Sequence, residues 1–120
     1  MKTFGEFISQ KRKDQMITLK AMAEAIGISS PYLSDVEKGN RDSFDLEKLE
    51  KIASFLKLSS EEKNEMMDLA GQQRKEVAPD LPEYINRVPA VSAALRTARD
   101  LDASEEEWHN FIKDLINRGQ

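Results

Sequence analysis

Apolar residues recur every three to four positions along most of the chain, and no segment shows sustained alternation of apolar and polar residues. This spacing predicts amphipathic helices, because three to four residues complete one helical turn. The expected helices cover about residues 4–13, 18–26, 29–38, 45–56, 59–75, 91–101 and 104–116. The pattern therefore predicts an all-α protein.

Capping residues mark where the expected helices at residues 18–26 and 29–38 begin and end. Thr18 and Ser29 each precede a helical run, and their side-chain oxygens are suited to accept a hydrogen bond from the first turn. Gly27 and Gly39 follow these runs, and glycine accepts the positive φ that commonly ends a helix. We therefore expect two short helices joined by a tight turn.

A proline-rich segment separates the first five expected helices from the last two. Pro79, Pro82 and Pro89 lie within a short stretch that lacks helical periodicity. Proline interrupts a helix because it lacks the amide hydrogen and fixes φ. We therefore predict a domain at residues 1–75, followed by a helical oligomerisation or partner-binding region at residues 76–120.

Five positions in the first half agree with the packing of a helix-turn-helix. Ala23 is small enough for two helix backbones to approach, and Gly27 suits the turn between them. Ile28, Leu33 and Val36 are spaced to pack the second helix onto the first. An ordinary αα-hairpin is the alternative, but the joint agreement of these positions favours a helix-turn-helix.

The stretches TLKAMAEAIGISSPYLSDVEKGNR at Thr18–Arg41 and LEKLEKIASFL at Leu46–Leu56 carry a family resemblance. Together they resemble the XRE family, the Cro- and phage-repressor-like helix-turn-helix domains. The resemblance covers about residues 3–58. It implies a lambda-repressor-like domain of five helices, whose third helix enters the major groove of double-stranded DNA.

The resemblance places six residues of the third helix and its cap against the DNA bases. Ser30 and Ser34 have hydroxyls that donate to or accept from base edges, and Tyr32 suits a thymine methyl or a phosphate. A structural role alone would also explain a cap, a helix-starting proline or an acidic residue near the helix N-terminus. The six candidate base-reading residues are Ser29, Ser30, Pro31, Tyr32, Ser34 and Asp35.

Further residues are expected to contact phosphates at the rim of this surface or to support it. The family pattern pairs Arg12 with Glu37 in a partly buried structural ion pair that holds the first helix against the third. Asp42 departs from the family pattern and adds a negative charge near the expected DNA backbone. The candidate phosphate-binding residues are Thr18, Lys20, Lys38, Asn40 and Arg41.

The net charge of −4 is unusual for a DNA-binding protein, but the negative charge is concentrated in the second half of the chain. Residues 1–57 contain ten Lys/Arg and nine Asp/Glu, a net charge of +1. Residues 58–120 contain eight Lys/Arg and thirteen Asp/Glu, a net charge of −5. Because affinity depends on the charges at the contact face, a nearly neutral first half remains compatible with DNA binding.

The last expected helices carry more apolar side chains than so short a segment buries by itself. We interpret them as a homodimerisation surface, since helix-turn-helix proteins pair two recognition helices on DNA. Packing onto the first domain is one alternative. A partner such as a toxin, an antirepressor or a protease is another. The candidate interface residues are Leu95, Trp108, Phe111, Ile112, Leu115 and Ile116.

Composition narrows the remaining function classes. The chain has no cysteine, so disulfides and thiolate metal sites are excluded, and no apolar run reaches the roughly 18 residues that span a bilayer. His109 is the only histidine, and we find no nucleophile–base pair, metal site or cofactor motif. We expect a cytoplasmic, non-enzymatic, homodimeric repressor without a cofactor. An antitoxin that regulates its own operon is the alternative.

Overall fold

A computed structural model describes residues 2–119, and all regular secondary structure in that range is helical. The prediction of an all-α fold is confirmed. The helices are α1 (Phe4–Asp14), α2 (Leu19–Ile26), α3 (Ser30–Glu37), α4 (Leu46–Phe55), α5 (Ser60–Arg74), α6 (Pro82–Arg87), α7 (Pro89–Asp100) and α8 (Glu105–Asn117).

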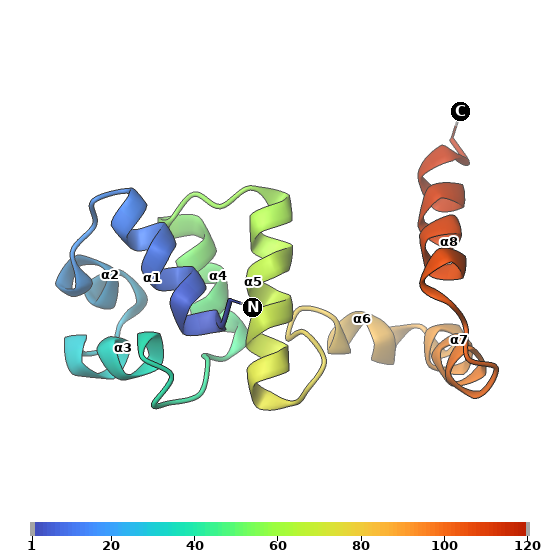
Figure 1. Ribbon diagram of the computed structural model, residues 1–120, viewed down its shortest axis with the longest axis horizontal. Helices are drawn as coiled ribbons and strands as arrows, with labels where there is room; N and C mark the ends of the chain where they lie inside the picture. The colour runs from blue at the N-terminus through green and yellow to red at the C-terminus, as the bar shows by residue number, and fades with distance from the viewer. Residues whose placement is uncertain (1, 120) are drawn as a thin grey trace. The chain divides into compact units, whose positions relative to one another are not determined.

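The first five helices form one compact unit that extends to Pro82 (Figure 1). Helix α1 packs against α3 and α5, and α2 packs against α3 and α4. This arrangement surrounds a single apolar core with side chains from every helix of the unit. Its largest fully buried side chains are Phe4, Phe7, Ile8, Met22, Ile26, Leu33, Val36, Leu49, Ile52, Leu56, Met66 and Met67.

A glycine allows α1 to approach the end of α3 closely. A Cβ atom built on Gly5 would lie 2.5 Å from the carbonyl oxygens of both Val36 and Glu37. Real Cβ atoms essentially never approach a backbone atom this closely. Residue 5 therefore has to be glycine for α1 and α3 to pack at this separation.

The chain folds back on α5 after that helix ends. Ala78 is 8% exposed, and a Cβ atom on Gly71 would lie 2.8 Å from the amide nitrogen of Ala78. This contact places the segment after α5 in the first unit, which reaches Pro82 and so extends beyond the predicted boundary at residue 75. The connecting region also contains the short helix α6, which the sequence analysis did not predict.

The second unit, residues 83–120, has no buried core among its described residues. Neither α7 nor α8 contains a buried side chain, and α6 contains none either. Helix α8 is nevertheless well capped, since Ser104 accepts a hydrogen bond from the Glu107 amide and the Glu107 carboxylate accepts one from the Ser104 amide. The helices of this unit are therefore defined by local signals, while their apolar faces remain open.

Candidate nucleic-acid interface

A left-handed glycine joins α2 to α3. Gly27 has φ of +79°, and its amide donates to carbonyl oxygens of the last turn of α2. Ser29 then caps α3, because its side-chain oxygen accepts a hydrogen bond from the Tyr32 amide at 3.2 Å. Leu33 and Val36 are fully buried and fix α3 to the core. The turn and the buried face together determine which side of α3 is exposed.

The six candidate base-reading residues lie along the outer side of α3 and its cap. Ser29, Pro31 and Asp35 are exposed, whereas Ser30, Tyr32 and Ser34 are half-buried. The hydroxyl of Ser29 is already used by the cap, so its availability to DNA is reduced. Thus α3 presents short polar side chains, which allow close approach of another macromolecule.

The tyrosine differs from its neighbours because its ring packs against other groups. The Tyr32 and Phe44 ring centroids are 5.7 Å apart, and the Arg41 guanidinium carbon lies 4.0 Å from the Tyr32 centroid. Phe44 is only 2% exposed. Tyr32 therefore joins the exposed Arg41 to the apolar core.

Cations without a carboxylate partner flank α3. Within residues 2–119, no carboxylate lies within 4.0 Å of the charged groups of Lys20, Lys38 or Arg41. Asn40 and Thr18 are also exposed, although the Thr18 hydroxyl accepts the Ala21 amide as the cap of α2. The predicted phosphate-binding residues thus include three cations with no competing ion pair.

Lys11 on α1, in contrast to these cations, has a carboxylate partner. The Lys11 ammonium forms an ion pair with Glu62 of α5. This hydrogen bond, with the cap formed by Ser59, lowers the pKa of the Glu62 carboxyl to about 2. Lys11 therefore serves the contact between α1 and α5 and is a poor candidate for DNA binding.

Arg12 and Glu37 form a nearly buried bidentate ion pair between α1 and α3. Arg12 Nε and Nη2 donate to the two carboxylate oxygens of Glu37, both at 2.9 Å, and Nη1 donates to the Ile17 carbonyl at 2.9 Å. The side chains are 11% and 8% exposed. The hydrogen bonds to Glu37 raise the pKa of the Arg12 guanidinium. This pair joins the end of α3 to α1.

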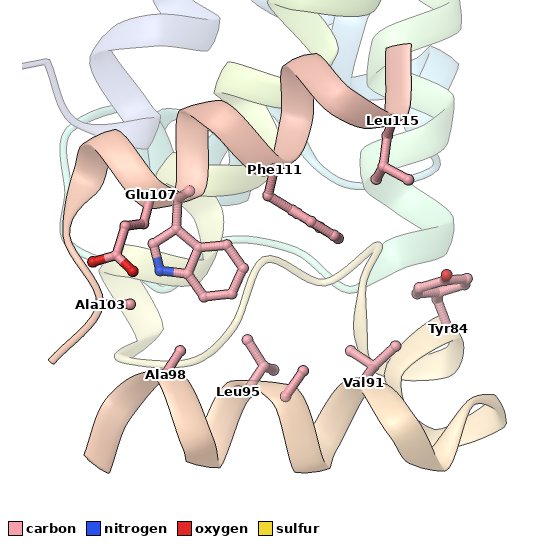
Figure 2. Close-up of a pocket in the computed structure, with 10 residues that line it drawn as sticks. Tyr84, Val91, Leu95, Ala98, Ala103, Glu107, Phe111 and Leu115 are labelled. Carbon is pink, nitrogen blue, oxygen red and sulfur yellow. The ribbon is translucent and has the colours of Figure 1, made fainter. Parts of the chain in front are cut away.

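The predicted interface residues lie on α7 and α8 of the second unit. Figure 2 shows Phe111 and Leu115 on α8 facing Leu95 and Val91 on α7 across an apolar groove of about 480 Å³. Trp108 also lines this groove, while Ile112 and Ile116 do not line it and are 48% and 68% exposed. The groove residues that the sequence analysis missed are Tyr84, Val91, Ala94, Ala98, Ala103 and Glu107.

Comparisons with known proteins find similarity in the first unit. The family described as Helix-turn-helix matches residues 8–63. Two Mycobacterium tuberculosis proteins, from strains CDC 1551 / Oshkosh and ATCC 25618 / H37Rv, are each 41% identical to the chain over 58 residues. Both carry the name "Uncharacterized HTH-type transcriptional regulator".

The similarity to these two relatives is confined to part of each protein. It covers 48% of this chain and 40% of each relative, so the chain spans less than half of their length. One chain of a solved structure, titled as a complex of the SinR and SinI proteins, is also similar to this chain. The match covers 98% of this chain and 98% of that chain, with a TM-score of 0.48 and 20% sequence identity.

Residues 2–119 lack two other classes of site. The described part of the chain contains no group of three or more His, Cys, Asp or Glu residues placed to hold a metal ion. None of its helices has both the length and the apolar character required to cross a membrane.

The ion pair of Arg12 and Glu37 gives a testable prediction for the first unit. Glu37→Ala would leave a nearly buried guanidinium without its counterion, so the free energy of unfolding should fall by about 3–5 kcal/mol. Glu47→Ala is the matched control because Glu47 forms an exposed ion pair with Lys51, at 3.5 Å. That change should cost about 1 kcal/mol or less in urea denaturation followed by circular dichroism. Equal losses in the two variants would contradict the structural role of the pair.

Proposed function

We propose that the chain, whose residues 8–63 match the family described as Helix-turn-helix, is a sequence-specific transcriptional regulator that binds double-stranded DNA. In this proposal α3 enters the major groove and its outer side chains contact base edges. The protein acts in the bacterial cytosol, where its operator is located.

The observation that carries the proposal is the combination of short polar side chains on α3 with exposed cations on α2 and in the segment that follows α3. Lys20 lies at the start of α2, while Lys38 and Arg41 follow α3, and all three are exposed. Phosphates border the bases of a DNA groove, so cations before and after a reading helix along the chain are suited to contact them. The N-termini of α2 and α3 add backbone amides that favour phosphate.

We further propose that the second unit pairs two copies of the chain. A unit of fewer than about 40 residues without disulfides or metal usually needs a partner to bury apolar surface. Residues 83–119 bury none of their side chains, and the groove between α7 and α8 is apolar. A second α7–α8 hairpin would supply the apolar surface that this groove lacks.

The charges of α7 and α8 favour a second copy as the occupant. Helix α7 carries Arg96, Arg99 and Asp100, a net charge of +1, although Asp100 pairs with Arg99 at 3.0 Å. Helix α8 begins with the three glutamates Glu105, Glu106 and Glu107. Each hairpin therefore offers a basic helix and an acidic helix to its partner. Two α3 helices about 34 Å apart would then select an inverted repeat. Where such a repeat overlaps a promoter, the bound dimer would exclude RNA polymerase, so we propose a repressor.

Selection from random duplex DNA with the purified full chain tests the regulatory function. We expect enrichment of one inverted repeat with half-sites about one helical turn apart, because two copies of α3 read equivalent sequences. Replacing both Ser30 and Ser34 with Ala should abolish or alter that preference while retaining salt-dependent binding. Recovery of the same sequence by this variant would contradict base reading by α3, and no enrichment by the wild type would overturn sequence-specific binding.

A change in the groove tests self-association. The full chain should sediment at twice its 13.7 kDa mass, and Phe111→Asp should sediment as a monomer because it places a carboxylate in an apolar interface. Asn110→Asp is the matched control, since Asn110 is exposed on the same helix but does not line the groove. This variant should remain dimeric.

Two outcomes would contradict pairing through the groove. A wild-type chain that remains monomeric at high concentration would exclude a second copy as the occupant. In that case, the occupant of the groove would be a different protein of the native host and not a second copy of the chain. Equal dissociation of the Phe111→Asp and Asn110→Asp variants would show that added charge alone weakens the dimer, without a specific role for the groove.

A further inference from the structure

A polar pocket lies beside α3 and is completed by a residue outside the helix-turn-helix. Arg41 reaches it from the loop after α3, and Arg74 reaches it from the last turn of α5. Two arginines from distant parts of the sequence therefore line one pocket. The complete lining is Tyr32, Asn40, Arg41, Asp42, Ser43 and Arg74.

The first guanidinium is held in place by an aromatic ring. Arg41 lies over the face of Tyr32, with 4.0 Å between the guanidinium carbon and the ring centroid, which is a cation–π contact. The ring itself packs against Phe44, which forms a T-shaped contact with Phe4 of α1, with centroids 6.1 Å apart. Tyr32 thus fixes Arg41 relative to the core and restricts the rotation of a long side chain.

Helix α5 holds the loop that carries Arg41. The Ser43 hydroxyl donates to the Ala70 carbonyl at 3.1 Å, and Gln73 Nε2 donates to the Arg41 carbonyl at 3.3 Å. Arg74 Nη1 donates to the Phe44 carbonyl at 3.5 Å. These contacts place Arg74 beside the loop and use only one of its five N–H donors.

The charges of the pocket favour an anion with several oxygens. No carboxylate in residues 2–119 lies within 4.0 Å of either guanidinium, so both charges remain available. Guanidinium groups bind phosphate through paired N–H donors. Asp42 also lines the pocket and opposes an anion, but the two cations outnumber it. The net charge of the pocket is therefore positive.

We propose that Arg41 and Arg74 together bind one DNA backbone phosphate next to the bases contacted by α3. Tyr32 is then a positioning residue for Arg41, not a base-reading residue. The inference rests on the proposed function, because the phosphate belongs to the same DNA that α3 contacts. It extends the DNA-binding surface to α5, beyond the helix-turn-helix itself.

Salt titration of binding to a short duplex of mixed sequence tests the role of Arg74. Arg74→Gln should weaken binding about tenfold to a hundredfold, as expected for the loss of a charged hydrogen bond. It should also reduce the slope of log affinity against log salt by about 0.9, the value for one phosphate contact. Lys75→Gln is the matched control, because it removes the same charge from an exposed neighbour that does not line the pocket.

Two substitutions at Tyr32 test its positioning role. Tyr32→Phe keeps the ring beneath Arg41, so both the affinity and the salt slope should match those of the wild type. Tyr32→Leu removes the cation–π contact and should weaken binding in the direction of Arg74→Gln. Loss of sequence preference in Tyr32→Phe would instead assign the hydroxyl to base reading. Thermal unfolding of each variant separates a binding loss from a folding defect.

The outcomes distinguish this inference from the proposed function. If the wild type does not bind the duplex at low salt, both are overturned. If the wild type binds and Arg74→Gln behaves like Lys75→Gln, only the phosphate site is overturned. A free phosphate ion has the same chemistry as a DNA phosphate, so competition by inorganic phosphate at matched ionic strength tests whether the pocket binds a free ion. We expect no specific competition, and competition that disappears in Arg74→Gln would instead assign the pocket to a free anion.

Discussion

The contact between α1 and the end of α3 sets the geometry on which the first unit depends. Arg12 and Glu37 join the two helices through paired hydrogen bonds of 2.9 Å, and Gly5 lets their backbones meet. Burying this ion pair is favourable only because its hydrogen bonds compensate for the loss of water. Since Glu37 ends α3, the pair also fixes the direction in which the outer side of α3 faces.

Much of the fold could be predicted from local sequence signals. The caps at Thr18 and Ser29, the left-handed Gly27 and the spacing of Leu33 and Val36 determine the helix-turn-helix by short-range chemistry. Helix α6 was missed because prolines obscured its short pattern. The sequence also contains no signal for the non-glycine residues that have positive φ, since their conformations depend on the turns around them. They are Met16, Lys57, Lys75 and Asp102.

The candidate site was only partly predictable because it combines residues far apart in the sequence. Arg41 could be assigned from its place after α3, but Arg74 joins the same pocket only through the packing of α5 on the intervening loop. Tyr32 looked like a base-reading residue because it lies on α3. The ring contacts with Phe44 and Arg41 suggest a different role, and no periodicity in the sequence contains that information.

The central claim is that α3 and the loop after it form the surface that contacts DNA. Amide chemical shifts of the full chain, measured by NMR during titration with duplex DNA, test this claim residue by residue. We expect the largest changes at residues 29–41, with a further change near Arg74 and little change at the buried core. Shifts concentrated on α4, with residues 29–41 unaffected, would contradict the account.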